Sequence, residues 1–370
     1  MSTQRLLVFP SSIDSAPPFM RVARSLGFEI IGADSTQGGV ASPDEDRHIH
    51  LPFITDERFD TVFFDSLAEL GITHVHAPHH GVWWHLNKLR EQPGKAFFLC
   101  APHPFDSHWE AFSPSLEWAE KQTTEALARA LPTPPRGLAA ALTTSQLAGL
   151  HRRFLQTPGE TDEDKLSGLC TIARIAPVGD VVEIGSLFGR SALALSWLAN
   201  HYRIGSTLCV DPWNLDDLTD QGPAAKILHD EPRSLDCEKI FRNFMATAAS
   251  SPGASYIRAP SERAIGTYAK AAEAGRYHAE GLDPVPIRGQ IALLHIDGNH
   301  RYDHVCADIA NWTPYLADHG WLMLDDYIWS FGDGPQRAGD ELLASGDYDH
   351  AFVLSDTLFL RRAPNTAHRR

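Results

Sequence analysis

Three acidic residues follow two apolar runs in the C-terminal half of the chain. Asp297 comes directly after IALLHI, and Asp325 and Asp326 follow GWLML. If both runs are strands of one parallel sheet, the carboxylates converge at its carboxyl edge and repel one another unless a cation joins them. Because carboxylate ligands without imidazole or thiolate favour Mg²⁺ or Mn²⁺ over zinc, we predict such a metal site at Asp297, Asp325 and Asp326.

A histidine accompanies these carboxylates. His300 lies three residues after Asp297, and the ordinary pKa of a histidine is near neutral, which suits a general base that removes a hydroxyl proton. Two structural alternatives stay open. Asp325 and Asp326 could cap a turn in solvent, and His300 could be held by a nearby carboxylate without any catalytic role.

The segment VVEIGSLFGRSALAL has the pattern of an apolar strand, a glycine turn and a helix. Gly185 and Gly189 allow the backbone to approach a ligand closely, and Ser186 lies between them. The spacing is E-x-G-x-x-x-G, which differs from the G-x-G-x-x-G of dinucleotide enzymes. Glu183 at the strand end and the missing third glycine argue against a pyrophosphate ligand.

The next apolar strand, TLCVDPW, ends at Asp211. An acidic side chain at this distance from a glycine turn can accept hydrogen bonds from both hydroxyls of a ribose. Two carboxylates, Glu183 and Asp211, suit a cofactor that has a ribose, an amino group and a positive sulfonium. The turn alone could belong to any nucleotide-binding α/β protein, but its coincidence with Asp211 favours the sulfonium cofactor.

Alternating strands and helices must position these residues. In the first hundred residues RLLVF, FEIIGAD and ITHVHAP are expected strands, with helices near 18–26 and 59–70 that end at Gly27 and Gly71. After a Pro-rich and then Ala/Leu-rich stretch, a second strand and helix series begins near residue 162. We therefore predict an α/β protein with an N-terminal α/β accessory domain (1–110), a helical connector (111–160) and a doubly wound, Rossmann-like domain (161–370).

Composition excludes several classes of partner. The 47 acidic residues outnumber the 32 basic ones, and this net charge of -15 repels nucleic acid and anionic membrane surfaces. The sequence has neither an apolar run long enough to span a bilayer nor a signal-peptide core. The five cysteines are odd in number and form no CxxC pair, so we expect a cytoplasmic protein.

Residues 179–362 resemble class I S-adenosylmethionine (SAM) methyltransferases. The segment HIDGNHRYDHVCADIANWTPYLADHGWLMLDDY is similar to metal-dependent sugar O-methyltransferases of the macrocin and mycinamicin type. The resemblance implies metal ligands at Asp297, Asp325 and Asp326, a base at His300, and cofactor contacts at Glu183, Gly185, Ser186, Gly189, Asp211, Ser261 and Asp297. It implies SAM and Mg²⁺ or Mn²⁺ as cofactors, and a homo-oligomer.

The expected activity is methylation of a hydroxyl on a small natural product, such as a sugar or a vicinal diol, in secondary metabolism. Two alternatives keep the same fold. One is metal-independent methyl transfer to nitrogen or a carboxylate, and the other is a non-catalytic SAM-binding accessory protein. The N-terminal domain loosely resembles the leading domain of ATP-grasp enzymes, and we expect it to shape the acceptor pocket or an oligomer contact.

Overall fold

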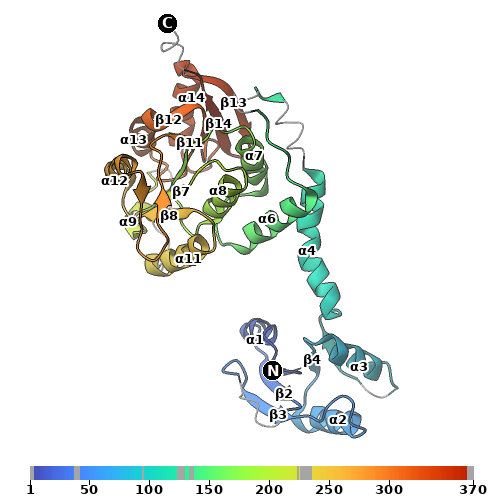
Figure 1. Cartoon of the computed structure of the whole chain (residues 1–370). Helices are drawn as coiled ribbons and strands as arrows, with labels where there is room; N and C mark the ends of the chain where they lie inside the picture. Colours follow the sequence, from blue (N-terminus) through green and yellow to red (C-terminus); the bar gives the residue numbers. More distant parts are fainter. Residues whose placement is uncertain are drawn as a thin grey trace. The chain divides into compact units, whose positions relative to one another are not determined.

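The computed structural model describes residues 4–36, 42–93, 96–122, 130–132, 137–222, 225 and 236–364. The chain divides into two compact units, residues 1–114 and 115–370 (Figure 1). The division falls within a single helix, α4 (Pro104–Lys121), which also crosses residue 110, the predicted end of the first domain.

The first unit contains a parallel five-stranded sheet in the order β3-β2-β1-β4-β5. Its elements are β1 (Arg5–Val8), α1 (Ala16–Ser25), β2 (Glu29–Asp34), β3 (Arg47–His50), α2 (Phe59–Leu70), β4 (His74–His76), α3 (His80–Arg90) and β5 (Phe98–Cys100). Gly71 ends α2 with φ +61°, a left-handed conformation that glycine adopts without steric penalty. The buried core lies between the sheet and α2 and α3 on one side, and between the sheet and α1 on the other.

The second unit contains a seven-stranded sheet in the order β13-β14-β12-β11-β6-β7-β8. The strands are β6 (Asp180–Ile184), β7 (Thr207–Val210), β8 (Ala254–Ile257), β11 (Ile291–Ile296), β12 (Leu316–Leu324), β13 (Tyr348–Leu354) and β14 (Thr357–Arg362). Strands β8, β7, β6, β11 and β12 are parallel, whereas β14 pairs antiparallel with both β12 and β13. Chain order reverses between β6 and β11, which is where ligands bind in doubly wound sheets. The predicted Rossmann-like fold is confirmed.

Helices cover both faces of this sheet (Figure 1). Besides the end of α4, the described residues of this unit form the helices α6 (Thr144–Gln156), α7 (Glu163–Ala173), α8 (Arg190–His201), α9 (Leu215–Thr219), α11 (Cys237–Ala249), α12 (Ser261–Ala274), α13 (Tyr302–Trp312), the 3₁₀ turn η2 (Thr313–Tyr315) and α14 (Gly334–Ser345). A short hairpin of β9 (Arg276–Tyr277) and β10 (Val285–Pro286) follows α12. Helix α6 packs on α8, so this part of the predicted connector belongs to the second unit.

Side chains alternate between the two faces of the central strands. Val182 and Ile184 of β6 pack into the core cluster that includes α12 and α13. Because successive strand residues point to opposite faces, Glu183 lies on the other face, and its register partner on β11 is His295. This pairing brings two polar side chains together inside the sheet, below the carboxyl edge.

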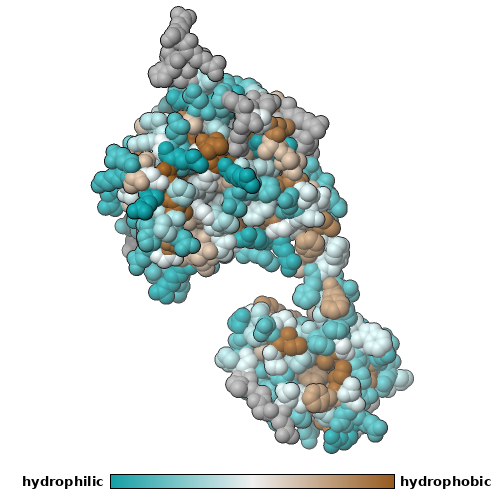
Figure 2. All heavy atoms as spheres, in the orientation of Figure 1, coloured by the Kyte–Doolittle hydropathy of each residue, from teal (hydrophilic) through white to brown (hydrophobic). Residues whose placement is uncertain are grey.

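Most of the surface visible in Figure 2 is hydrophilic or intermediate in hydropathy, with hydrophobic side chains in small groups. Large exposed hydrophobic residues include Ile328 and Phe331, which follow the end of β12. Among the described residues, no helix combines the length and the hydrophobicity that crossing a bilayer requires.

Candidate active site

A cavity of about 370 Å³ opens at the carboxyl ends of β6, β7, β11 and β12 in the second unit. Most of the predicted site residues line it: Gly185, Ser186, Asp211, Ser261, Asp297, His300, Asp325 and Asp326. Glu183 and Gly189 do not belong to its lining. The sheet topology therefore brings together residues that lie more than a hundred positions apart in the sequence.

The two glycines of the turn have different roles. Gly185 has φ +82°, and a Cβ added there would lie 1.9 Å from the carbonyl oxygen of Asp297. Only glycine allows β6 and β11 to approach this closely at their ends. Gly189 has φ +93° and precedes α8, where a Cβ would meet the side chains of Phe244 and Thr247 at 3.1 and 3.3 Å. Gly189 therefore permits close packing of α8 on α11, and its predicted contact with the cofactor receives no support from the cavity lining.

Glu183 is fully buried beneath the turn. Its carboxylate accepts a hydrogen bond of 2.6 Å from the hydroxyl of Ser186 and lies 3.1 Å from Nδ1 of His295. These contacts hold the carboxylate away from the cavity. The predicted contact of Glu183 with the cofactor stays a prediction, and in the structure Glu183 contacts the glycine turn through Ser186.

Asp211 closes the turn from the end of β7. Its Oδ2 accepts hydrogen bonds of 3.0 Å from the backbone N–H groups of Ser186 and Leu187, and its Oδ1 accepts one of 2.6 Å from Trp213. Burial raises the pKa of Asp211, and the three backbone donors oppose that rise. Since a carboxylate offers about four acceptor positions, little capacity remains for the two ribose hydroxyls that we expected it to bind.

Ser261 begins α12 and faces α13. Its hydroxyl donates to Asp308 of α13, and both residues line the cavity. Burial raises the pKa of Asp308 to about 7, although the bond from Ser261 acts in the opposite direction. Ser261 was expected to contact the cofactor, and this stays a prediction; in the structure its hydroxyl links α12 and α13 at the cavity wall.

The acidic cluster contains a cation that the sequence analysis missed. The ammonium group of Lys165, on α7, contacts Oδ2 of Asp325, and Oδ1 of Asp325 accepts a hydrogen bond of 2.6 Å from Thr357. Burial alone would lower the pKa of Lys165, but the charges of Asp325 and Asp297 raise it overall. Burial and the charge of Asp325 raise the pKa of Asp297, whereas Lys165 and His295 keep the pKa of Asp325 low despite its burial.

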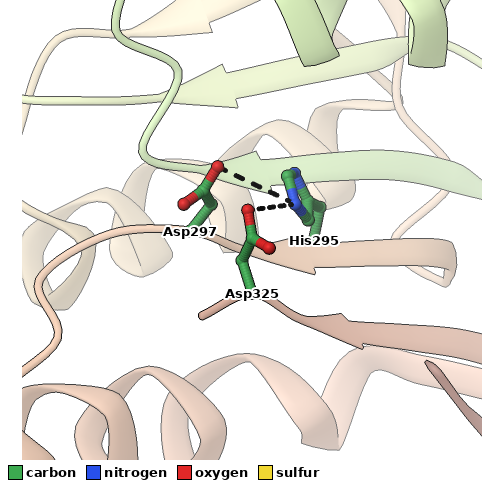
Figure 3. Close-up of side chains that lie close together, drawn as sticks. All are labelled: His295, Asp297 and Asp325. Carbon is green, nitrogen blue, oxygen red and sulfur yellow. Dashed lines mark ion pairs between the residues drawn. The ribbon is translucent and has the colours of Figure 1, made fainter. Parts of the chain in front are cut away.

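His295 lies beneath the carboxylates and is fully buried. Asp297 and Asp325 both point toward its ring (Figure 3), and its Nε2 lies 3.9 Å from Asp297 and 3.7 Å from Asp325. Burial lowers its pKa, but the neighbouring carboxylates of Asp325 and Glu183 outweigh burial, so the pKa of His295 is raised. His295 thus lies between Glu183, under the glycine turn, and the carboxylates of Asp297 and Asp325 at the cavity.

His300 lies on the cavity side of the cluster. Its Nε2 is 2.7 Å from Oδ2 of Asp326, and its ring packs at 4.5 Å from the ring of Trp329. Asp326 adopts φ +51°, and Asp297, His300 and Asp326 place one ligand atom each within 4.8 Å of one another. This group offers two carboxylates and one imidazole to a divalent cation, while His300 stays next to the cavity.

Sequence reasoning missed Lys165 and His295. His295 had a visible signal, because it is the one ionisable residue inside the apolar run IALLHI. Lys165 had a weaker one: it shares a helical stripe with Leu169 and Ile172, both of which are buried. A lysine on an apolar stripe of a helix, in a chain with several clustered carboxylates, is a candidate for a buried ion pair.

One family model matches part of the second unit. Residues 182–327 match the family model described as a methyltransferase domain, and this range contains the ten predicted site residues. No curated protein matches the chain.

Solved structures with similarity include the O-methyltransferase NovP, with 16% identity, a TM-score of 0.37, and coverage of 68% of this chain and 99% of NovP. They also include CalS11, a TDP-rhamnose 3'-O-methyltransferase of calicheamicin biosynthesis, with 15% identity, a TM-score of 0.37, and coverage of 73% and 99%. At these values the superpositions carry no argument about chemistry. Residues 182–327 therefore carry a methyltransferase domain, and the strand order of the second unit is that of a Rossmann-like fold.

Proposed function

We propose that this chain is a SAM- and divalent-metal-dependent O-methyltransferase that acts on a hydroxyl of a small natural product, such as a sugar or a vicinal diol. The observation that carries the proposal is the grouping of Asp297, His300 and Asp326 in the cavity that also contains the glycine turn. The metal ligands, the base and the glycine turn then face the same cavity.

The donor atoms fit a hard divalent ion at the cavity face of the cluster. Carboxylate oxygens of Asp297 and Asp326 are ligands that Mg²⁺ and Mn²⁺ prefer, and both residues are only partly buried, which leaves room for water or substrate oxygens. When bound, such an ion lowers the pKa of a coordinated hydroxyl, and SAM supplies the methyl group.

The residues of the chain have separate tasks in this scheme. His300 accepts the proton of the acceptor hydroxyl, and the carboxylate of Asp326 lies 2.7 Å from its Nε2 as an ion-pair partner. Gly185 and Ser186 bring backbone to the cofactor. Trp329 lies beside His300, and Phe331 lies 5.6 Å from Trp329, so these rings offer an apolar surface for the carbon skeleton of the acceptor.

One observation favours a second candidate, metal-independent transfer on the same fold. Lys165 already neutralises Asp325, so this carboxylate does not need an ion. In that case methyl transfer would go to nitrogen or a carboxylate and would survive chelation.

Chelation separates the two candidates. Methyl transfer from labelled SAM to a panel of diols and sugars is measured with Mg²⁺ and after EDTA, followed by readdition of Mg²⁺. The proposal predicts that turnover disappears with EDTA and returns with Mg²⁺. Turnover that persists unchanged in EDTA supports the metal-independent candidate and contradicts ours.

A further inference from the structure

Two groups of possible metal ligands overlap at the edge of the cavity and share Asp297. The inner set is His295, Asp297 and Asp325, and the outer set is Asp297, His300 and Asp326. Although Asp325 and Asp326 are consecutive, they belong to different sets. The inner set lies deeper, because His295 and Asp325 are buried, whereas all three members of the outer set are partly exposed.

The inner set already has a positive partner from the chain itself. The side chain of Lys165 is 5% exposed, its ammonium contacts Oδ2 of Asp325, and it lies 3.9 Å from a carboxylate oxygen of Asp356. Thr357 donates to the other oxygen of Asp325. Both oxygens of Asp325 are therefore engaged by donors, and one of these donors carries a full charge.

His295 completes the surroundings of Asp325. Its Nε2 is fully buried, has no hydrogen-bond partner of good geometry in the described structure, and lies 3.7 Å from the same oxygen that Lys165 contacts. A divalent ion in the inner set would therefore sit beside the ammonium of Lys165 in a buried environment, where repulsion between like charges is only weakly screened.

We propose that Lys165 is the built-in cation of the inner set, and that the divalent ion binds only in the outer set, through Asp297 and Asp326. Asp325 is then a positioning residue and not a metal ligand, in contrast to the assignment that the sequence resemblance implies. This inference rests on the metal dependence of the proposed function. It assigns to α7, outside the matched methyltransferase range, a residue that decides where the ion binds.

The test measures Mn²⁺ binding to the full-length protein by electron paramagnetic resonance, without any turnover. The double variant Lys165→Met/Asp325→Asn removes both charges of the inner pair with little change in volume, so no buried charge is left unpaired by the loss of its partner. We expect its Mn²⁺ affinity to stay within about threefold of the wild-type value. Asp326→Asn should lower the affinity by about tenfold or more, because it removes a ligand.

The single variant Lys165→Met opens the inner set, and in folded protein we expect it to bind a second Mn²⁺ ion. If the double variant instead loses Mn²⁺ as completely as Asp326→Asn does, Asp325 is a ligand and the inference is overturned. It is also overturned if the wild-type protein binds no Mn²⁺. S-adenosylhomocysteine (SAH) binding is measured on the same samples. The methyltransferase assignment predicts that SAH binds whether or not the metal inference is correct, so loss of SAH binding would show failure of that assignment instead.

Discussion

The ring of His300 has two fixed neighbours, Asp326 at 2.7 Å and Trp329 at 4.5 Å. A general base contributes about a hundredfold or more to turnover. We therefore expect His300→Ala to lower kcat by about that factor and to leave SAH affinity unchanged, as measured by steady-state kinetics and calorimetry. The control is His278→Ala, at an exposed histidine outside the cavity lining. Near-normal turnover of His300→Ala would remove this residue from the base role.

A second prediction at the scale of one residue concerns the stability of a Gly185 variant. An alanine there needs φ +82° and also meets the carbonyl of Asp297, whereas Gly275 has φ +70° with no atom within 4 Å of an added Cβ. Both substitutions strain the backbone, and only the first creates a clash. Gly185→Ala should therefore lower the free energy of unfolding by at least about 1 kcal/mol more than Gly275→Ala in urea titrations. Equal losses would show that the close approach to Asp297 has no energetic importance.

The sequence predicted the residues at the strand ends better than their partners. Asp297 and Asp326 could be placed in one cavity because the carboxyl ends of parallel strands share one edge. Lys165 could not, because it reaches the cluster from a helix face, and spacing along the sequence does not reveal which helix packs over which strand end. The position of Glu183 in the motif was visible, but its burial depended on the register with His295.

At the scale of elements, the contact between α12 and α13 predicts a pH dependence of stability. The pKa of Asp308 in the folded protein, about 7, lies above the ordinary value near 4, so the folded state binds more protons than the unfolded state between these values. The stability that protonated Asp308 gives the folded protein is therefore fully present below about pH 4. The free energy of unfolding then decreases as pH rises toward 7, by at most about 1.4 kcal/mol per pH unit.

Urea titrations from pH 4 to 8 test this contribution. The variant Asp308→Asn should flatten the pH dependence in that window, and Asp318→Asn, at an exposed position on β12, should leave it in place. If both variants follow the wild-type curve, Asp308 is ionised in the folded protein at lower pH than the structure indicates.

The order of elements was largely predictable, but the antiparallel edge of the second sheet and the packing of the connector were not. The expected helix over 59–70 matches α2, and Gly71 ends it. The antiparallel pair β13 and β14 was not anticipated, since the strand and helix alternation that reveals a parallel sheet ends after β12. The predicted connector 111–160 contains α6, whose amphipathic pattern does not reveal that it packs on α8.

At the scale of the whole molecule, the candidate active site belongs to the second unit. Every residue that lines the cavity comes from positions 159–356, within the second unit. The accessory role of the first unit, its loose resemblance to ATP-grasp enzymes and the homo-oligomeric state stay predictions. Light scattering of the purified chain tests the last of these, and we expect a mass above that of the 40.9 kDa monomer.

The central claim is that the cavity of the second unit binds SAM, and calorimetric titration of the full-length protein with SAH tests it most directly. We predict saturable binding with one site per chain, both with Mg²⁺ and after chelation. The reason is that Asp211 holds the glycine turn in place through hydrogen bonds that need no ion. Absence of SAH binding under both conditions would contradict the account.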